Sequence, residues 1–163
     1  MEQFEQIYKE YYPRVYTFLY KLCKSRELTE EMTQDTFYEL YKSLHKYNGS
    51  CQFFTFIAAI AKNVYYKYIR KKRITCIDIN TVEELQDLSD TPEEACLRNL
   101  KSVKIRQVVN MLPKNYRDVV LLRAYADLTF PDIANILGIS TSSAKVIFHR
   151  AKKILTEELF DER

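Results

Sequence analysis

The segment from Thr129 to Leu155 constrains the fold more than any other part of the chain, because two short amphipathic patterns are separated there by one glycine. Thr129 is a good N-cap, and Asp132 three residues later suits the positive end of a helix dipole. Gly138 can take the left-handed conformation that ends a helix and turns the chain. A second helix is expected to begin at Ser140 or Thr141 and to run to about Leu159. The segment therefore predicts a helix-turn-helix.

The second of these predicted helices has one apolar and one polar face. Its apolar face carries Ala144, Ile147 or Phe148, Ala151, Ile154 and Leu155, and its polar face carries Ser142, Ser143, Lys145, His149, Arg150, Lys152 and Lys153. The short hydroxyl side chains lie in the first turn, and the basic side chains follow them along the helix. This order suits a helix that enters a DNA major groove, with its first turn near base edges and its basic residues on phosphates. The alternative is a plain helical hairpin with a solvated basic face.

Composition favours an all-α protein. The 163 residues include only two Gly and four Pro, and 47% of them are hydrophobic, which suits long helices around one core or two small ones. No apolar run approaches the roughly 20 residues that span a bilayer, and the first ten residues are too acidic for a signal peptide. We therefore expect a cytoplasmic protein without membrane insertion.

The cysteines do not predict a metal site. Cys23, Cys51, Cys76 and Cys96 are widely spaced, no C-x-x-C pair occurs, and His45 and His149 are the only histidines. We expect reduced and mostly buried thiols. No catalytic constellation or phosphate-binding loop is present either, so the sequence predicts no cofactor, no metal and no enzymatic activity.

Charge divides the chain into three parts. Residues 1–73 carry 13 Lys and Arg against 8 Asp and Glu, residues 74–97 carry none against 7, and residues 98–163 carry 12 against 7. This pattern predicts two small helical domains, 1–73 and 98–163, joined by an acidic linker over 74–97. Such a linker would avoid a DNA backbone that the basic domains bind. The alternative, which the charge pattern supports equally well, is that residues 74–97 form a solvated loop whose charge has no role.

The first domain is expected to contain helices separated by two breaks. An apolar stripe from Phe4 to Leu22 is interrupted at Pro13, where a second helix is expected to begin. Thr29 is the expected N-cap of the next helix. The turn signal Asn48-Gly49 lies in the loop over 47–52, and a long helix is predicted from Phe53 to about Arg73.

Aromatic residues are concentrated in this first domain, which holds 17 of the 22 Tyr and Phe residues. On the last helix they lie beside Lys62, Lys67 and the basic run Arg70–Arg73. Aromatic rings beside cations hold unstacked bases, at about 1 to 3 kcal/mol for each stacked base. One helical stripe cannot bury so many rings, although a core role is the usual one for such a cluster.

Three segments, in order, resemble the sigma-70 family of bacterial RNA polymerase sigma factors, of the extracytoplasmic-function type. EEMTQDTFYELY at Glu30–Tyr41 resembles the polymerase-binding segment of region 2. FFTFIAAIAKNVYYKYIRKKR at Phe53–Arg73 is similar to the segment that recognises and melts the −10 element. Residues Leu112–Ser140, with the helix that follows, resemble region 4, which reads the −35 element.

The resemblance implies specific partners and contacts. Core polymerase would be bound through its β′ clamp helices and β flap, with Glu31, Gln34, Asp35 and Phe37 on the clamp helices. The −10 DNA would be met by Tyr47, Asn48, Gly49, Ser50, Phe53, Phe56, Lys62, Asn63, Lys67 and Arg70. The −35 DNA would be met by Ser140, Thr141, Ser142, Ser143, Lys145, Phe148, His149 and Arg150. The family is usually held inactive by an anti-sigma factor, often a membrane-bound one.

The chain departs from the family pattern at several positions, two of which bear on DNA contact. Phe56 stands where the family often has Trp, so the wedge that splits the duplex would be smaller. Ile147 stands where many members have Arg, which removes one phosphate contact and favours inward packing of Ile147.

Two other classes of protein remain open on the residues alone. A self-sufficient helix-turn-helix regulator with an N-terminal ligand or dimerisation domain would explain the second domain equally well, but not the basic aromatic helix that ends at Arg73. A helical adaptor that binds a membrane or a protein through basic helices is the third reading.

Overall fold

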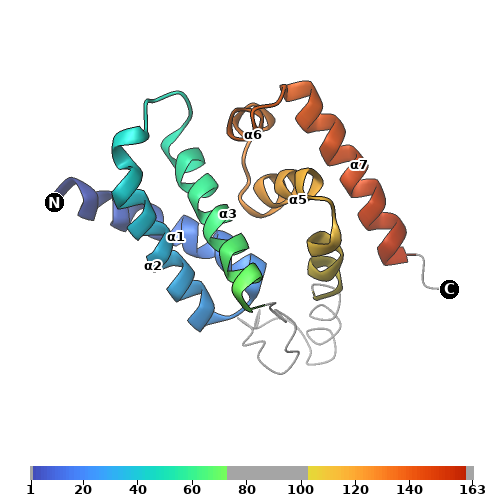
Figure 1. Cartoon of the computed structure of the whole chain (residues 1–163), viewed down its shortest axis with the longest axis horizontal. Coiled ribbons are helices and arrows are strands. Elements are labelled where there is room, and N and C mark those ends of the chain that lie inside the picture. The colour runs from blue at the N-terminus through green and yellow to red at the C-terminus, as the bar shows by residue number, and fades with distance from the viewer. Residues whose placement is uncertain (1, 73–102, 161–163) are drawn as a thin grey trace, which may run out of the picture.

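The computed structural model describes residues 2–72 and 103–160, and every regular element in these two ranges is helical. The N-terminal lobe contains α1 (Glu2–Cys23), α2 (Arg26–Ser43), the 3₁₀ turn η1 (Leu44–Lys46) and α3 (Phe53–Lys72). The C-terminal lobe contains a helix over 103–111, α5 (Lys114–Val120), the π-helical turn η3 (Leu121–Tyr125), α6 (Phe130–Leu137) and α7 (Thr141–Phe160) (Figure 1). The all-α prediction with two helical units is confirmed. The predicted acidic linker lies outside the described residues.

Helix α1 passes through Pro13 without a break, so the predicted second helix at this point was wrong. A proline inside a helix removes one hydrogen bond and crowds the carbonyl four residues before it, at about 3 kcal/mol or more. Tertiary packing offsets this cost, because the helix after Pro13 buries an almost complete apolar stripe: Val15, Phe18, Leu19, Leu22 and Cys23.

The N-cap of helix α2 lies four residues before the predicted cap, Thr29. The N-cap is Ser25, whose Oγ accepts a hydrogen bond from the backbone N–H of Leu28 at 3.4 Å. Thr29 is buried in the first turn and donates its hydroxyl to the Ser25 carbonyl at 2.6 Å. Thr33 and Thr36 are also buried and bond carbonyls one turn back in the same way. Threonine suits this buried face because its hydroxyl is satisfied on its own helix.

The predicted helix-turn-helix is present as α6 and α7. Thr129 caps α6 by accepting from the N–H of Asp132 at 3.3 Å, and Gly138 ends the helix in the left-handed conformation at φ 67°. Ser140 caps α7 by accepting from the N–H of Ser143 at 3.0 Å. The rings of Phe130 and Phe148 meet edge to face at 5.6 Å and hold the two helices together.

Replacing Gly138 by alanine tests the turn. A Cβ at this position would meet no atom within 4 Å, so the whole cost comes from the left-handed backbone. We expect Gly138→Ala to lower the free energy of unfolding by about 1 kcal/mol, measured by urea denaturation. Gly138→Asn is the matched control and should lose less, because asparagine tolerates this conformation. Equal stability of both variants and the parent would contradict the predicted strain.

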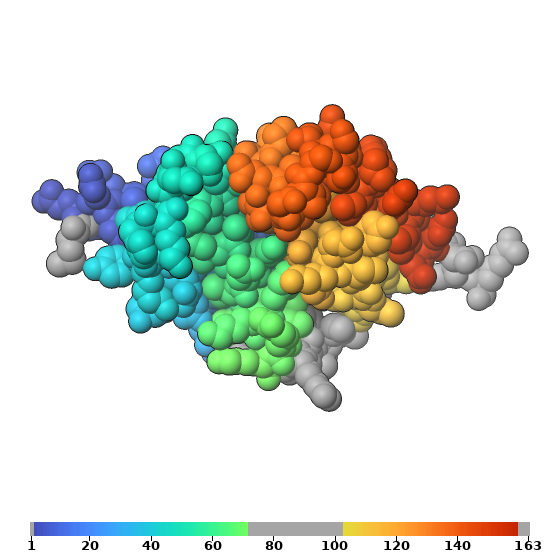
Figure 2. Space-filling view, turned by 45° about the horizontal axis from the view of Figure 1, so that its top comes forward, coloured from blue at the N-terminus to red at the C-terminus, as the bar shows by residue number. Residues whose placement is uncertain are grey.

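The two lobes pack against each other and share one apolar core. Buried residues of α1 and α3, such as Phe18 and Ile57, belong to the same cluster as Val119 and Leu122 of the C-terminal lobe. Helix α3 contacts both α6 and η3, and α1 contacts η3. Figure 2 shows the surface of α3, in green, against those of α5 and α6, in yellow and orange. The lobes are therefore closed on each other, which the charge pattern alone did not predict.

Candidate nucleic-acid interface

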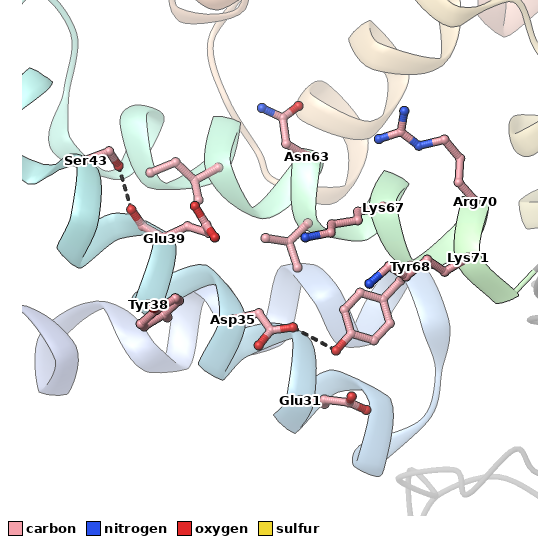
Figure 3. Close-up of a pocket in the computed structure, with 12 residues that line it drawn as sticks. Glu31, Asp35, Tyr38, Glu39, Ser43, Asn63, Lys67, Tyr68, Arg70 and Lys71 are labelled. Carbon is pink, nitrogen blue, oxygen red and sulfur yellow. Dashed lines mark hydrogen bonds between the residues drawn. The ribbon is translucent and has the colours of Figure 1, made fainter.

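A groove of about 660 Å³ runs between α2 and α3 and carries opposite charges on its two walls (Figure 3). Glu31, Asp35 and Glu39 line it from α2, and Lys67, Arg70 and Lys71 line it from α3. Asn63 lies on the same side of α3 and is exposed. The acidic wall on α2 thus suits a basic partner, and the basic wall on α3 suits phosphates.

Tyr68 bridges the two walls of this groove. Its phenol donates a hydrogen bond to Asp35 Oδ2 at 2.8 Å, as Figure 3 shows. Burial raises the pKa of Tyr68, and the neighbouring Asp35 and Glu31 carboxylates raise it further, so the phenol remains a donor at neutral pH. Tyr68 could not be predicted as a groove residue from the sequence, because it lies 33 positions from Asp35 and no local pattern links the two.

The residues that the family resemblance places in contact with polymerase lie on two different faces of α2. Glu31, Gln34 and Asp35 are exposed. Phe37 is only 3% exposed, and its ring packs against Tyr8 and Tyr12 at 4.8 and 6.2 Å. Two residues of helix separate Phe37 from Asp35 by about 200°, so the two side chains point in opposite directions. The implied contact between Phe37 and polymerase is therefore corrected to a role in the core.

The loop over 47–52 presents polar groups beside an aromatic wall. Gly49 adopts φ 79°, and the backbone N–H of Ser50 donates to Asn48 Oδ1 at 3.0 Å. The Tyr47 ring packs against Phe53 and Phe56 at 5.0 and 5.4 Å. All three rings are partly buried, whereas Asn48, Gly49 and Ser50 are exposed. The loop therefore presents exposed amide and hydroxyl groups beside apolar rings.

Helix α3 exposes some of its implied DNA contacts and buries others. Asn63, Lys67 and Arg70 are exposed, but Lys62 is only 7% exposed. The rings of Tyr65 and Tyr66 are also buried. Lys62 therefore faces the C-terminal lobe in this structure rather than solvent, and for these two tyrosines the core reading of the aromatic cluster is the correct one.

The buried Lys62 has its partner in the other lobe. Its Nζ lies 3.8 Å from Asp118 Oδ2, and the Tyr66 hydroxyl donates to the second carboxylate oxygen. The guanidinium of Arg117 lies 4.5 Å from the centre of the Tyr66 ring. Burial lowers the pKa of Lys62 and Asp118 opposes this shift, while burial and Asp118 together raise the pKa of Tyr66. We call these four residues the inter-lobe latch.

Asp118 is a buried latch residue that was not among the residues selected from the sequence, although a signal for it exists. The carboxylate directly precedes the apolar run Val119–Leu122 and lies one turn before Leu121 and Leu122, which are both buried. An acid on a buried helix face requires a donor or a cation as partner. That rule points to a partner without identifying it, since Lys62 lies 56 positions earlier.

Helix α7 presents most of its implied DNA contacts to solvent. Exposed along it are Ser142, Ser143, Lys145, His149 and Arg150. Ser140 uses its hydroxyl as the helix cap, and Phe148 packs on Phe130 with part of its ring exposed. Thr141 is partly buried. Ile147 packs against the core, which confirms the expected inward orientation.

Two further searches cover only the described parts of the chain. Within residues 2–72 and 103–160, no three His, Cys, Asp or Glu side chains are grouped so that they could hold a metal ion. None of the helices in these ranges has the length and apolar character needed to cross a membrane.

Family models decide the identity of the two lobes. A model described as Sigma-70 region 2 matches residues 7–74, and one described as Sigma-70, region 4 matches residues 102–155. The chain belongs to the sigma-70 family. The first match contains the groove and the aromatic loop, and the second contains the helix-turn-helix. This sigma factor directs core polymerase to promoters by recognising −10 and −35 elements, and it is not itself an enzyme.

Curated relatives place the sigma factor in the extracytoplasmic-function type. It is 29% identical over 168 residues to the RNA polymerase sigma factor YlaC of Bacillus subtilis, with 99% of this chain and 97% of that protein covered. It is 28% identical over 157 residues to the ECF RNA polymerase sigma factor SigM of the same organism, with coverages of 93% and 91%. Because these matches span both lobes, the self-sufficient regulator is not favoured.

Solved structures share the fold. The sigma factor RpoE of Bartonella quintana, in complex with the anti-sigma factor NepR, matches with a TM-score of 0.64 at 19% identity and full coverage of both chains. CnrH, in complex with the cytosolic domain of CnrY, matches with a TM-score of 0.65 at 16% identity, over 98% of this chain and 89% of the other.

Proposed function

We propose that the groove between α2 and α3 joins polymerase binding to −10 recognition in this sigma factor. Glu31, Gln34 and Asp35 contact the clamp helices of the β′ subunit, while Lys67 and Arg70 hold the DNA backbone. The observation that carries this assignment is the exposed acidic wall of α2, which faces the exposed basic wall of α3. A basic, hydrogen-bonding partner suits the first wall and phosphates suit the second.

The loop over 47–52 receives an unpaired −10 base in this proposal. Asn48, Gly49 and Ser50 provide polar contacts, the rings of Tyr47, Phe53 and Phe56 form the wall, and Asn63 bonds the base or its neighbour. Flipping a base costs a few kcal/mol, which stacking and hydrogen bonds to its edge offset. Phe56 stands where the family often has Trp. In this proposal the Tyr47 ring beside Phe56 enlarges the aromatic surface, so that the smaller Phe56 ring can still stack on the base.

The −35 element is read by α7. Ser142 and Ser143 lie in its first turn, where they reach base edges, and Lys145, His149 and Arg150 follow on the exposed side and meet the backbone. Ser140 and Thr141 shape the start of the helix, and Phe148 supports its angle to α6.

An anti-sigma factor is part of this proposal, as is a cytoplasmic location beside polymerase and DNA. Of the two solved structures above, one is a sigma factor in complex with an anti-sigma factor, and the other is CnrH in complex with the cytosolic domain of CnrY. This chain exposes large apolar side chains that suit such a partner, among them Tyr38 and Tyr41 of α2, each 62% exposed.

Run-off transcription with reconstituted core polymerase on a library of randomised promoters tests the proposed function. Specific initiation that depends on this chain, with two recurring elements upstream of the start sites, is the expected result. Tight duplex binding without core, and no initiation, would instead support a regulator. The selected promoters also provide the DNA for the experiments below.

Arg150 is expected to contribute one phosphate contact to −35 binding. With a selected −35 duplex, Arg150→Ala should weaken binding by holoenzyme and reduce the slope of log K against log salt by about 0.9. Arg26→Ala is the matched control, since it removes an exposed guanidinium from α2 in the other lobe and should leave the slope unchanged. An unchanged slope in Arg150→Ala would remove this residue from the DNA contact.

A further inference from the structure

We propose that the C-terminal lobe is an internal inhibitor of −10 recognition, in which the Asp118 carboxylate occupies the place of a DNA phosphate on Lys62. The inter-lobe latch must then separate before α3 can hold promoter DNA. This inference rests on the proposed −10 role of α3 and adds to it a regulating partner that is part of the same chain.

The first argument is the chemistry of the latch. Lys62 and Asp118 are 7% and 5% exposed, although Lys62 lies on the helix that carries the exposed DNA contacts Asn63 and Lys67. A buried ammonium is strongly unfavourable unless an anion pairs with it. Carboxylate and phosphate oxygens are both anionic acceptors for an ammonium donor, so one can replace the other. Tyr66 adds a second donor to the same carboxylate.

The second argument is that the C-terminal lobe also contacts the −10 loop. The amide of Asn135, on α6, donates to the backbone carbonyl of Ser50 at 3.1 Å. The lobe therefore contacts α3 at Lys62 and Tyr66 and the loop at Ser50. Promoter DNA cannot reach Lys62 or Tyr66 while the lobe is in place, and Asn135 occupies the Ser50 carbonyl, although Ser50, Lys67 and Arg70 stay exposed. The closed chain retains weak, non-specific DNA binding and lacks the complete −10 site.

The third argument is the separation of the promoter elements. Sites between one and two turns of DNA apart lie roughly 35 to 70 Å from each other. In the closed chain α6 contacts α3 directly and also packs on α7, so the two DNA-reading helices are only one helix apart. The lobes must move away from each other to reach both elements. The latch sets the free energy of that movement.

Asp118→Asn in the full-length chain tests the latch. Asparagine keeps the shape and an acceptor for Tyr66 but leaves the buried ammonium without a counter-charge, which favours the open chain. Small-angle X-ray scattering should show a larger radius of gyration. The affinity for a labelled random-sequence single-stranded DNA should rise about tenfold, and its salt slope should steepen by about 0.7 as Lys62 gains a phosphate.

Asp127→Asn is the matched control. It makes the same charge change at the same lobe boundary, but Asp127 and its partner Lys21, at 3.9 Å, are exposed, and such pairs contribute little. Asp127 has φ 57°, a conformation that asparagine accepts. Scattering and affinity close to those of the parent are expected. Equal gains in both variants would show that charge removal alone improves binding, and would overturn the latch.

Tyr66→Phe is the second test variant, and it decides the question if Asp118→Asn does not fold. It removes only the hydroxyl that binds Asp118, so scattering and affinity should change in the same direction by a smaller amount. Parent-like scattering and affinity in every folded latch variant would overturn the proposal.

Holoenzyme separates failure of the latch from failure of the proposed function. Once core has opened the chain, Asp118→Asn should open promoters as the parent does. If the −10 assignment of α3 is wrong, removal of the Asn63 side chain will leave promoter opening unchanged, whatever the scattering of the latch variants shows. If only the latch is wrong, removal of the Asn63 side chain will slow promoter opening by holoenzyme. Asp118→Asn will then leave the scattering and the DNA affinity of the free chain unchanged.

Discussion

Replacing Gln34 and Asp35 together by alanine is expected to lower the affinity for core polymerase about a hundredfold and to abolish run-off transcription at limiting concentration. Truncating one charged, hydrogen-bonded partner in an interface costs about 2 to 5 kcal/mol, and 1.4 kcal/mol is tenfold in affinity. Both side chains are exposed on α2, and the hydrogen bond from Tyr68 holds the Asp35 carboxylate in one orientation before the partner arrives. Titration of labelled core polymerase measures the loss.

Glu30→Ala is the control for this double variant. Glu30 is an exposed acid on the same helix, but it lies near Tyr12 and Tyr16 of α1 rather than in the groove. It should bind core as the parent does. The double variant should also unfold with the same free energy as the parent. Without core polymerase, it should bind the −35 duplex with the same affinity as the parent. A comparable loss of core binding in Glu30→Ala would mean that the total charge of α2, and not the groove, is what polymerase reads.

Asn63→Ala is expected to slow open-complex formation about tenfold or more while leaving core affinity unchanged. Asn63 is exposed on α3 at the groove, where its amide has both donors and an acceptor for a base edge. Its truncation leaves the flipped base without a partner, and the cost of about 1 to 3 kcal/mol falls on the melted state. Stopped-flow fluorescence of a labelled −10 base measures the rate.

Gln6→Ala is the control for Asn63→Ala, because it removes an exposed amide from α1 at a distance from the groove. It should open promoters at the parental rate. A promoter pre-melted by mismatches at −10 should recover most of the defect of Asn63→Ala, since its duplex no longer has to be opened. A loss of core affinity in Asn63→Ala would show that the two walls of the groove do not have separate roles.

Local signals in the sequence were reliable where neighbouring residues decide the structure. The cap at Thr129 and the left-handed Gly138 depend on one or two residues, and both formed as predicted. Pro13 and Thr29 misled because packing of whole helices outweighed the local preference of each residue. Phe37 misled for a different reason. Its motif position implied a contact, whereas the helical period turns it away from Asp35 and into the core.

The sequence by itself determined the all-α class, the helix-turn-helix and the basic end of α3, because helical periodicity and capping act over a few residues. Only the tertiary structure decided that the lobes close on each other, that Lys62 is paired with Asp118, and that Tyr68 holds Asp35. These contacts join residues 33 and 56 positions apart. They depend on how whole helices pack, and a buried charge in a sequence shows only that a partner is needed.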